Sequence, residues 1–186
     1  MDDILVFGST EEEHDQRLEE TLKRLQTAGL TLNKQKCEFS KTEISFLGQT
    51  ISQEGIQADN EKIKAILNFP EPQDVSELRS FLGMVNQMGK FIEGRAEITA
   101  PLSELLSVKK VWLWGPPQAM AFKRIKGLLC NTPVLALYSP ERETKVTADS
   151  SSYGLGAVIR QKVENEWKPV AYASRNLTPT KSATPR

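Results

Sequence analysis

Two adjacent aspartates near the start of the chain are the side chains best placed to do metal chemistry. Asp2 and Asp3 lead directly into residues 4–7, an apolar run of strand-forming residue types that Gly8 closes. We therefore predict a short strand with paired carboxylates at its mouth. Carboxylates fixed at a strand end can bind a hard divalent cation such as Mg²⁺. An idle, solvated acidic pair is the alternative that these residues alone leave open.

The overall composition is that of an ordinary globular protein, with 39% hydrophobic residues, 26% charged residues and a formal net charge of zero. Charge is nevertheless uneven along the chain. Between Arg79 and Lys126 there are eight Lys or Arg residues against three Glu, a local net charge of +5. A basic middle of this kind fits a phosphate backbone and an ordinary solvated helix face equally well.

The sequence carries few signals for other classes of protein. No apolar run reaches the length of a membrane span, and no basic-then-apolar leader opens the chain. The two cysteines, Cys37 and Cys130, lack the spacing of a zinc site or of a disulfide framework. We therefore expect an intracellular protein, cytoplasmic or nuclear, with no membrane partner.

Hydrophobic periodicity and capping signals predict five helices. Capping boxes at residues 10–13 and 74–77 open two of them, and Gly29 is placed to end the first. The second presents an apolar face made of Leu78, Phe81, Leu82 and Val85. The remaining helices are expected at residues 59–69, 100–106 and 118–129.

Extended segments are predicted toward both ends of the chain. Residues 43–51 are expected to be extended around a tight bend or close backbone approach at Gly48, and residues 53–55 form a turn. Later strands are expected at residues 145–149, 155–161 and 169–174. Asp149 ends the first of these strands, beside a turn of small residues. The predicted fold class is α+β, divided into pieces at about 1–55, 56–110 and 111–186.

Taken in order, these segments resemble the reverse transcriptase and ribonuclease H (RNase H) region of LTR-retrotransposon Pol polyproteins, most closely the gypsy type. The start of the chain resembles the Tyr-x-Asp-Asp motif of the polymerase palm without its tyrosine. Further matches are residues 32–39 to the Lys-Cys-x-Phe segment, 46–56 to the primer grip and 78–86 to the thumb helix. Residues 147–151, 154–158 and 169–175 resemble the first three strands of the RNase H domain.

The resemblance assigns a part of the polyprotein to each piece of the chain. Residues 1–55 correspond to a truncated polymerase palm with its primer grip, and residues 56–110 to the helical thumb and connection. Residues 111–186 correspond to the N-terminal part of an RNase H-like mixed sheet.

The chemistry that the resemblance implies is two-metal catalysis at two places. Asp2 and Asp3 would be two of the three palm carboxylates that hold Mg²⁺ for nucleotidyl transfer. Asp149 would be the first of the RNase H carboxylates that hold Mg²⁺ for hydrolysis of RNA in hybrids. The third palm aspartate and the other RNase H carboxylates have no counterpart in this sequence, and residues 181–186 depart from the family pattern. We therefore expect neither activity from these 186 residues alone.

The implied partners are an RNA–DNA hybrid or a template–primer duplex, a deoxynucleoside triphosphate, and the remaining parts of the Pol polyprotein. Expected nucleic-acid contacts come from the primer grip and the basic middle of the chain: Phe46, Leu47, Gly48, Arg79, Lys90, Lys109 and Lys110. The thumb departs from its relatives around Gly89, where glycine lowers helix stability by about 1 kcal/mol relative to alanine. Trp112 and Trp114 fit either base stacking or a packing anchor.

Three functional hypotheses follow. The chain is an enzyme segment whose catalysis belongs to a longer Pol polyprotein, a binding module that holds an RNA–DNA duplex without chemistry, or a translated retroelement remnant without function. Salt-dependent duplex binding that survives Asp149→Asn favours the second hypothesis, and non-cooperative unfolding favours the third.

Overall fold

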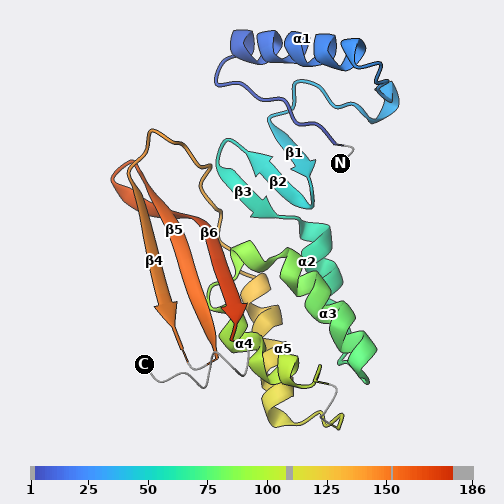
Figure 1. The fold of residues 1–186 in the computed structure, drawn as a ribbon, viewed down its shortest axis with the longest axis vertical. Helices are drawn as coiled ribbons and strands as arrows, with labels where there is room; N and C mark the ends of the chain where they lie inside the picture. The colour runs from blue at the N-terminus through green and yellow to red at the C-terminus, as the bar shows by residue number, and fades with distance from the viewer. Residues whose placement is uncertain (1–2, 108–110, 152, 178–186) are drawn as a thin grey trace.

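The computed structural model describes residues 3–107, 111–151 and 153–177. In this part of the chain, two antiparallel sheets of three strands each border a group of four α-helices, α2 to α5 (Figure 1). A further helix, α1, lies apart from that group at one end of the molecule. The α+β fold class predicted from the sequence is confirmed.

The N-terminal segment corrects one sequence prediction. Residues 3–8 have no secondary structure, although residues 4–7 were predicted to form a strand. The reason is that no described strand pairs with these residues, so their backbone groups form no hydrogen bonds between strands. Ile4 and Phe7 are 55% and 69% exposed. The Phe7 carbonyl oxygen accepts a hydrogen bond of 2.9 Å from Arg17 Nη1, which ties the segment to α1.

Helix α1 (Glu11–Thr27) begins at the predicted capping box. Thr10 Oγ1 accepts the Glu13 N–H at 3.2 Å, and Glu13 Oε2 accepts the Ser9 N–H at 2.7 Å. The helix buries no residue, so tertiary packing contributes little to its stability. Caps and surface ion pairs such as Lys23 Nζ to Glu19 Oε1, at 2.6 Å, support it instead.

The first sheet consists of β1 (Glu43–Phe46), β2 (Gln49–Ser52) and β3 (Gly55–Ala58) in the order β1-β2-β3. A 3₁₀ turn at Lys34–Lys36 precedes it. Leu47 and Gly48 join β1 to β2 with φ angles of 50° and 75°, so the predicted bend is a two-residue hairpin turn. Strand β3 was not predicted, because Gly55 indicated only a turn.

The helical group consists of α2 (Asn60–Leu67), α3 (Val75–Gln87), α4 (Arg95–Glu104) and α5 (Pro116–Leu129), with a 3₁₀ turn at Gly89–Phe91. Helix α3 ends just before Gly89, consistent with the weak helix-forming tendency of glycine. Helix α4 begins five residues earlier than predicted, and α5 begins with two prolines in its first turn, where proline is tolerated. No described helix is long and apolar enough to cross a bilayer.

The core lies between these helices. The predicted apolar face of α3 is buried, and Phe81 at its centre is fully covered. Its ring centroid lies 4.6 Å from that of Phe122 on α5. Trp112 and Trp114 stack at 5.9 Å between centroids and are partly buried against the same core, which supports the packing interpretation over base stacking.

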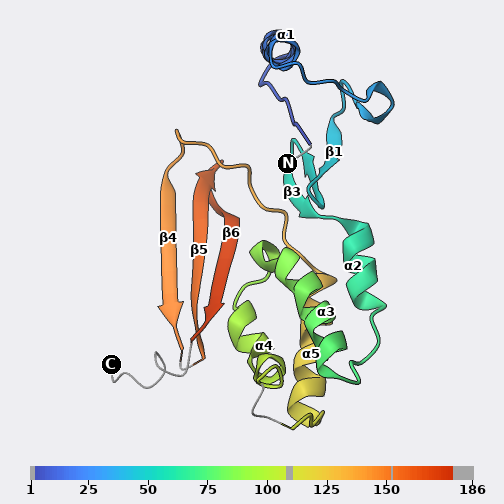
Figure 2. The ribbon, with the colours of Figure 1, turned by 45° about the vertical axis from the view of Figure 1, so that its right-hand side comes forward.

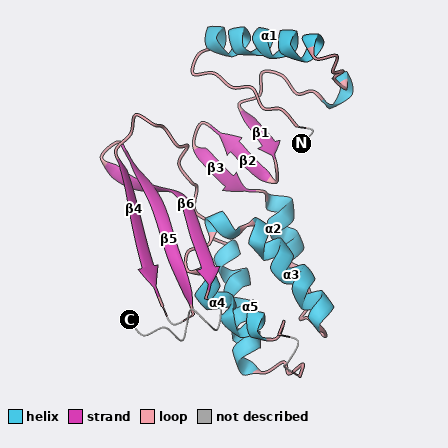
Figure 3. Cartoon of the chain, in the orientation of Figure 1, coloured by secondary structure: helices cyan, strands magenta, loops and turns pink. Residues whose placement is uncertain are grey.

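The second sheet consists of β4 (Thr144–Ser150), β5 (Gly154–Val163) and β6 (Glu166–Asn176) in the order β4-β5-β6. All three predicted strands are confirmed, and each is longer than expected. One face of the sheet is turned toward the helices, and β6 is the strand nearest to them (Figure 2). Figure 3 shows the same division by colour, with the two magenta sheets on either side of a long loop that follows α5.

That loop contains a segment that joins the two sheets, residues 133–140, which we call the strap. Leu135 is fully buried and exchanges two hydrogen bonds with Ile56 of β3, at 2.8 and 2.9 Å. The next N–H, of Ala136, donates to the Pro169 carbonyl oxygen of β6 at 2.7 Å. Farther along, the buried amide of Gln161 bonds both the N–H and the carbonyl of Ser139, at 2.9 and 2.7 Å.

Gly55 allows the strap to cross β3. Its φ is +138°, and a Cβ at this position would lie 2.2 Å from the Leu135 carbonyl oxygen. We predict that Gly55→Ala lowers the free energy of unfolding by at least about 2 kcal/mol, because the strap must shift and its paired hydrogen bonds weaken.

The matched control is Gly83→Ala in α3, where a Cβ would meet no atom within 4 Å. Alanine there should raise stability by about 0.5–1 kcal/mol. Urea unfolding followed by circular dichroism compares the two variants. If Gly55→Ala were as stable as the unmodified chain, the close approach of the strap to Gly55 would not limit the residue at this position.

Candidate functional site

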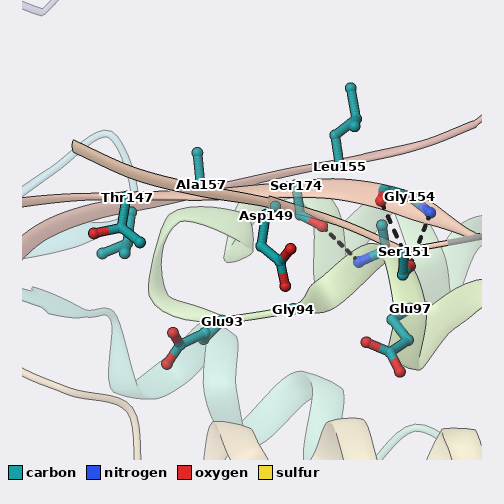
Figure 4. A pocket seen from close by; sticks show the side chains of 13 residues that line it. Glu93, Gly94, Glu97, Thr147, Asp149, Ser151, Gly154, Leu155, Ala157 and Ser174 are labelled. Carbon is teal, nitrogen blue, oxygen red and sulfur yellow. Dashed lines mark hydrogen bonds between the residues drawn. The ribbon is translucent and has the colours of Figure 1, made fainter. Parts of the chain in front are cut away.

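Asp149 lies in a pocket of about 200 Å³ between the second sheet and the N-terminal end of α4. Figure 4 shows its carboxylate pointing from β4 toward Gly94, with Glu93 and Glu97 on either side of that point. The side chain is exposed, and its Oδ1 accepts the N–H of Ser150 at 2.7 Å. Water therefore reaches this carboxylate, although the N-terminal end of α4 lies across the pocket from it.

The wall of the pocket is formed by α4, which β6 holds in place. The N-cap residue of α4 is Gly94, which has no side chain to accept a helix N–H. Ser174 of β6 replaces that cap, since its Oγ accepts the Ala96 N–H at 2.8 Å. Arg95 Nη2 donates to the Ser174 carbonyl oxygen at 3.0 Å. A Cβ on Gly154 of β5 would lie 2.9 Å from the Ala96 Cβ, so the approach is close.

The acidic residues of this pocket do not form a magnesium site. Reverse transcriptases and RNases H generally use Mg²⁺, which needs several oxygen ligands pointing at one place. No group of three or more His, Cys, Asp or Glu side chains within residues 3–107, 111–151 and 153–177 could hold a metal ion. Glu93 is also drawn toward Arg160, at 3.8 Å. The described donor set therefore does not fit the metal.

The three aspartates predicted from the sequence are not brought together. Asp3 is exposed in the segment that precedes α1, whereas Asp149 lies on β4 facing α4. Asp2 lies outside the described residues. Their roles as metal ligands stay predictions.

The predicted primer-grip residues form the tip of the β1–β2 hairpin. Phe46 ends β1 and is partly buried, and Leu47 is 60% exposed at the tip. Gly48 faces Lys62 of α2, and a Cβ there would lie 2.0 Å from the Lys62 Nζ. The close approach inferred from Gly48 is therefore the approach of this lysine, which the sequence analysis did not name.

Two lysines contact the hairpin, Lys62 beside Gly48 and Lys90 at Gln49. Arg95 lies beside Gly89, the chain neighbour of Lys90. We call these three residues, Lys62, Lys90 and Arg95, the junction cations. Lys62 Nζ donates to Gln87 Oε1 at 3.4 Å, and Lys90 Nζ donates to Gln49 Oε1 at 2.5 Å. The Arg95 guanidinium donates to Asn86 Oδ1 and, as above, to β6. Burial lowers the pKa of both Lys90 and Arg95.

Among the described residues, no carboxylate lies within ion-pair distance of any junction cation. Their partners are neutral amide and carbonyl oxygens. Of the other predicted nucleic-acid contacts, Arg79 is exposed on α3, whereas Lys109 and Lys110 lie outside the described residues.

Comparisons with known proteins place these features in one class. Residues 1–51 match the family described as reverse transcriptase (RNA-dependent DNA polymerase). Residues 114–186 match the family described as the RNase H-like domain found in reverse transcriptase.

Similar proteins include transposon polyproteins of the fission yeast Schizosaccharomyces pombe. The Tf2-3 polyprotein is 36% identical over 179 residues, and the Tf2-7 polyprotein is 35% identical over the same length. These matches cover 96% of this chain, which spans 13% of the length of each relative.

Solved structures with the same fold are complexes of the foamy viral protease-reverse transcriptase. The complex with RNA/DNA hybrid has a TM-score of 0.77 at 28% identity, over 95% of this chain and 24% of that one. A complex with double-stranded DNA has a TM-score of 0.75 at 29% identity, over 95% of this chain and 37% of that one.

The fold and the matches together define a reverse transcriptase segment joined to an RNase H-like segment. The chain belongs to the Pol polyproteins of gypsy-type LTR retrotransposons, as its resemblance to that family predicted.

The burial of Lys90 predicts its titration behaviour. Desolvation lowers its pKa below the ordinary value of 10.5, whereas the ion pair with Glu61 raises the pKa of Lys64 above that value. Proton binding to Lys90 therefore opposes folding, and stability rises as the pH increases from the folded-state pKa of Lys90 toward 10.5. NMR titration of the lysine ε-methylene groups should show Lys90 losing its proton at a lower pH than Lys64. The reverse order would mean that Lys90 is solvated and that its contact with Gln49 does not persist in solution.

Proposed function

We propose that this chain holds a template–primer duplex within a longer Pol polyprotein, using the hairpin tip at residues 47–48, helix α3 and the junction cations. The observation that carries the proposal is that Lys62 and Lys90 contact the hairpin, and Arg95 lies near Lys90, without a carboxylate partner among the described residues. Cations paired only with neutral oxygens can exchange those bonds for charge-assisted bonds to phosphate without breaking an ion pair.

The arrangement suits a nucleic-acid backbone in a second respect. The exposed Arg79 lies on α3, the same helix that supplies Gln87 to Lys62, so further positive charge lies along the thumb helix. Neutralised phosphates release counterions, which makes the affinity of such a surface depend strongly on salt. That foamy viral reverse transcriptase is seen with RNA/DNA hybrid and with double-stranded DNA supports the choice of partner.

Catalysis belongs, in this proposal, to the longer polyprotein. There Asp2 and Asp3 act as palm carboxylates with a deoxynucleoside triphosphate as substrate, and Asp149 acts in hydrolysis of RNA. The chain of 186 residues binds duplex without either reaction, since its described carboxylates do not converge. Magnesium-dependent primer extension or hybrid cleavage by the purified chain, abolished by Asp3→Asn or Asp149→Asn respectively, would contradict this assignment.

The division into parts at residues 1–55, 56–110 and 111–186 belongs to the same proposal. Helix α5 lies beyond residue 110 yet shares its core with α2, α3 and α4. We therefore expect α5 to unfold together with the thumb helices.

Loss of two junction cations should weaken duplex binding. We predict that Lys62→Gln with Lys90→Gln lowers the affinity for an RNA–DNA hybrid of about 20 base pairs by about tenfold, and reduces the slope of log affinity against log salt by about 1–2. Fluorescence anisotropy over a range of salt concentrations measures both quantities.

The matched control carries the same loss of charge elsewhere. Lys23→Gln with Lys64→Gln removes two exposed lysines that already pair with Glu19 and Glu61. This control should bind within about twofold of the unmodified chain. Equal weakening of both double variants would mean that net charge alone drives binding and that the junction cations hold no duplex.

A further inference from the structure

Gly89 leaves a space that the side chain of Arg95 fills. A Cβ at position 89 would lie 3.2 Å from Arg95 Cζ and 3.3 Å from both Nε and Nη1 of the same guanidinium group. Because these three atoms of a planar group are almost equally distant, the Cβ would lie over one face of the guanidinium. An alanine at position 89 would therefore have to displace this group, whereas glycine leaves it in place.

The guanidinium is also held by two hydrogen bonds. Nη1 donates to Asn86 Oδ1 near the end of α3, and Nη2 donates to the Ser174 carbonyl oxygen of β6 at 3.0 Å. Ser174 Oγ accepts the Ala96 N–H at 2.8 Å, so the same residue also holds the backbone next to Arg95. Two such bonds orient a planar group whose donors point in fixed directions. We call Gly89, Asn86 and Ser174 the Arg95 socket.

The socket leaves Arg95 poorly placed to contact a phosphate. Its Nε is buried, without a hydrogen-bond partner in the described part of the chain. Desolvation lowers the pKa of Arg95, as expected for a cation held away from water. To reach a phosphate, the guanidinium would have to give up its bonds to both α3 and β6.

The two lysines at the junction are held by fewer bonds. Lys62 Nζ and Lys90 Nζ each donate to one glutamine side chain, at 3.4 and 2.5 Å. An ammonium group on a flexible stem can exchange one neutral bond for a phosphate contact without moving the backbone that carries it. The junction cations therefore divide into two lysines suited to contact a duplex and one arginine suited to hold the structure around them.

We propose that Arg95 is a positioning residue for duplex binding, which holds the turn that carries Lys90 against β6 while Lys62 and Lys90 contact the phosphates. The turn is the 3₁₀ segment Gly89–Phe91, and β6 packs beside it. Arg95 joins the two, since it lies against Gly89 and bonds Ser174. This role rests on the duplex-holding function proposed above, and it gives the RNase H-like sheet a part in supporting that surface.

Salt dependence separates a positioning residue from a phosphate contact. We expect Arg95→Gln to lower the affinity for an RNA–DNA hybrid of about 20 base pairs by about fivefold, with the slope of log affinity against log salt unchanged. Lys90→Gln, which removes a proposed phosphate contact, should reduce that slope by about 1. Fluorescence anisotropy over a range of salt concentrations measures both variants.

Arg95→Lys tests whether the positive charge alone is enough. Lysine keeps the charge but cannot donate to Asn86 and Ser174 in the fixed geometry of a guanidinium. We therefore expect Arg95→Lys to bind the hybrid as weakly as Arg95→Gln in the same anisotropy experiment.

A double-mutant cycle tests the socket without any duplex. Gly89→Ala should raise the equilibrium constant for unfolding by about fivefold while Arg95 is present, and should leave it unchanged or lower it in the Arg95→Ala background. Urea unfolding followed by circular dichroism measures the cycle, and Arg95→Gln replaces Arg95→Ala if the alanine variant does not fold. Gly83→Ala, where a Cβ would meet no atom within 4 Å, is the control and should have the same effect in both backgrounds.

Two results would overturn the proposal. A salt slope that falls by about 1 in Arg95→Gln, or recovery of binding by Arg95→Lys, would make Arg95 a phosphate contact. Additive effects of Gly89→Ala and Arg95→Ala on unfolding would mean that the socket does not exist. An unmodified chain that binds no hybrid would instead contradict the duplex-holding function itself, and the unfolding cycle would still decide the socket. An unchanged slope, no recovery with lysine and a coupled cycle together support the positioning role.

Discussion

The pair of hydrogen bonds between Ile56 and Leu135 is the constraint on which the arrangement of this molecule depends. Leu135 is fully buried, and both of its backbone polar groups are satisfied by one residue of β3. The following residue, Ala136, donates to β6. One short strap therefore fixes the first sheet and the RNase H-like sheet to each other across the helical core. Breaking a buried backbone pair would leave its donor and acceptor unsatisfied, which is costly.

A second long-range contact sets the environment of Asp149. Helix α4 lacks a capping side chain of its own and takes one from Ser174 of β6. The helix is thereby held against the face of the sheet that carries Asp149, and Arg95 is held between β6 and the end of α3. The position of Arg95 and the position of α4 opposite Asp149 thus depend on the same residue, Ser174. A motion that freed Asp149 from α4 would also displace Arg95.

The features that the sequence predicted are those governed by residues near one another in the chain. The caps of α1 and α3 involve side chains three residues from the N–H that they accept, and the buried face of α3 follows from helical spacing. The three strands of the second sheet likewise follow from local alternation and turn residues. The family resemblance added the link to reverse transcriptase and RNase H, which the matches to these two families confirm.

The features that the sequence did not predict depend on partners far along the chain. The N-terminus of α4 was placed too late, because its cap comes from a residue 78 positions away. Residues 4–7 lack the neighbouring strand that their composition suggested. Lys62 was overlooked as a neighbour of the hairpin tip, although Gly48 correctly indicated that something approaches the backbone there.

The central claim is our proposal that duplex is held where the hairpin tip meets helix α3, and hydrogen-exchange mass spectrometry with and without an RNA–DNA hybrid tests it most directly. The account predicts slower exchange on hybrid binding in residues 47–49 and 86–95, which carry or adjoin the junction cations. Exchange in α1 should stay unchanged, because that helix lies apart from the junction. Protection confined to α1 or to the second sheet, with none at the junction, would contradict the account.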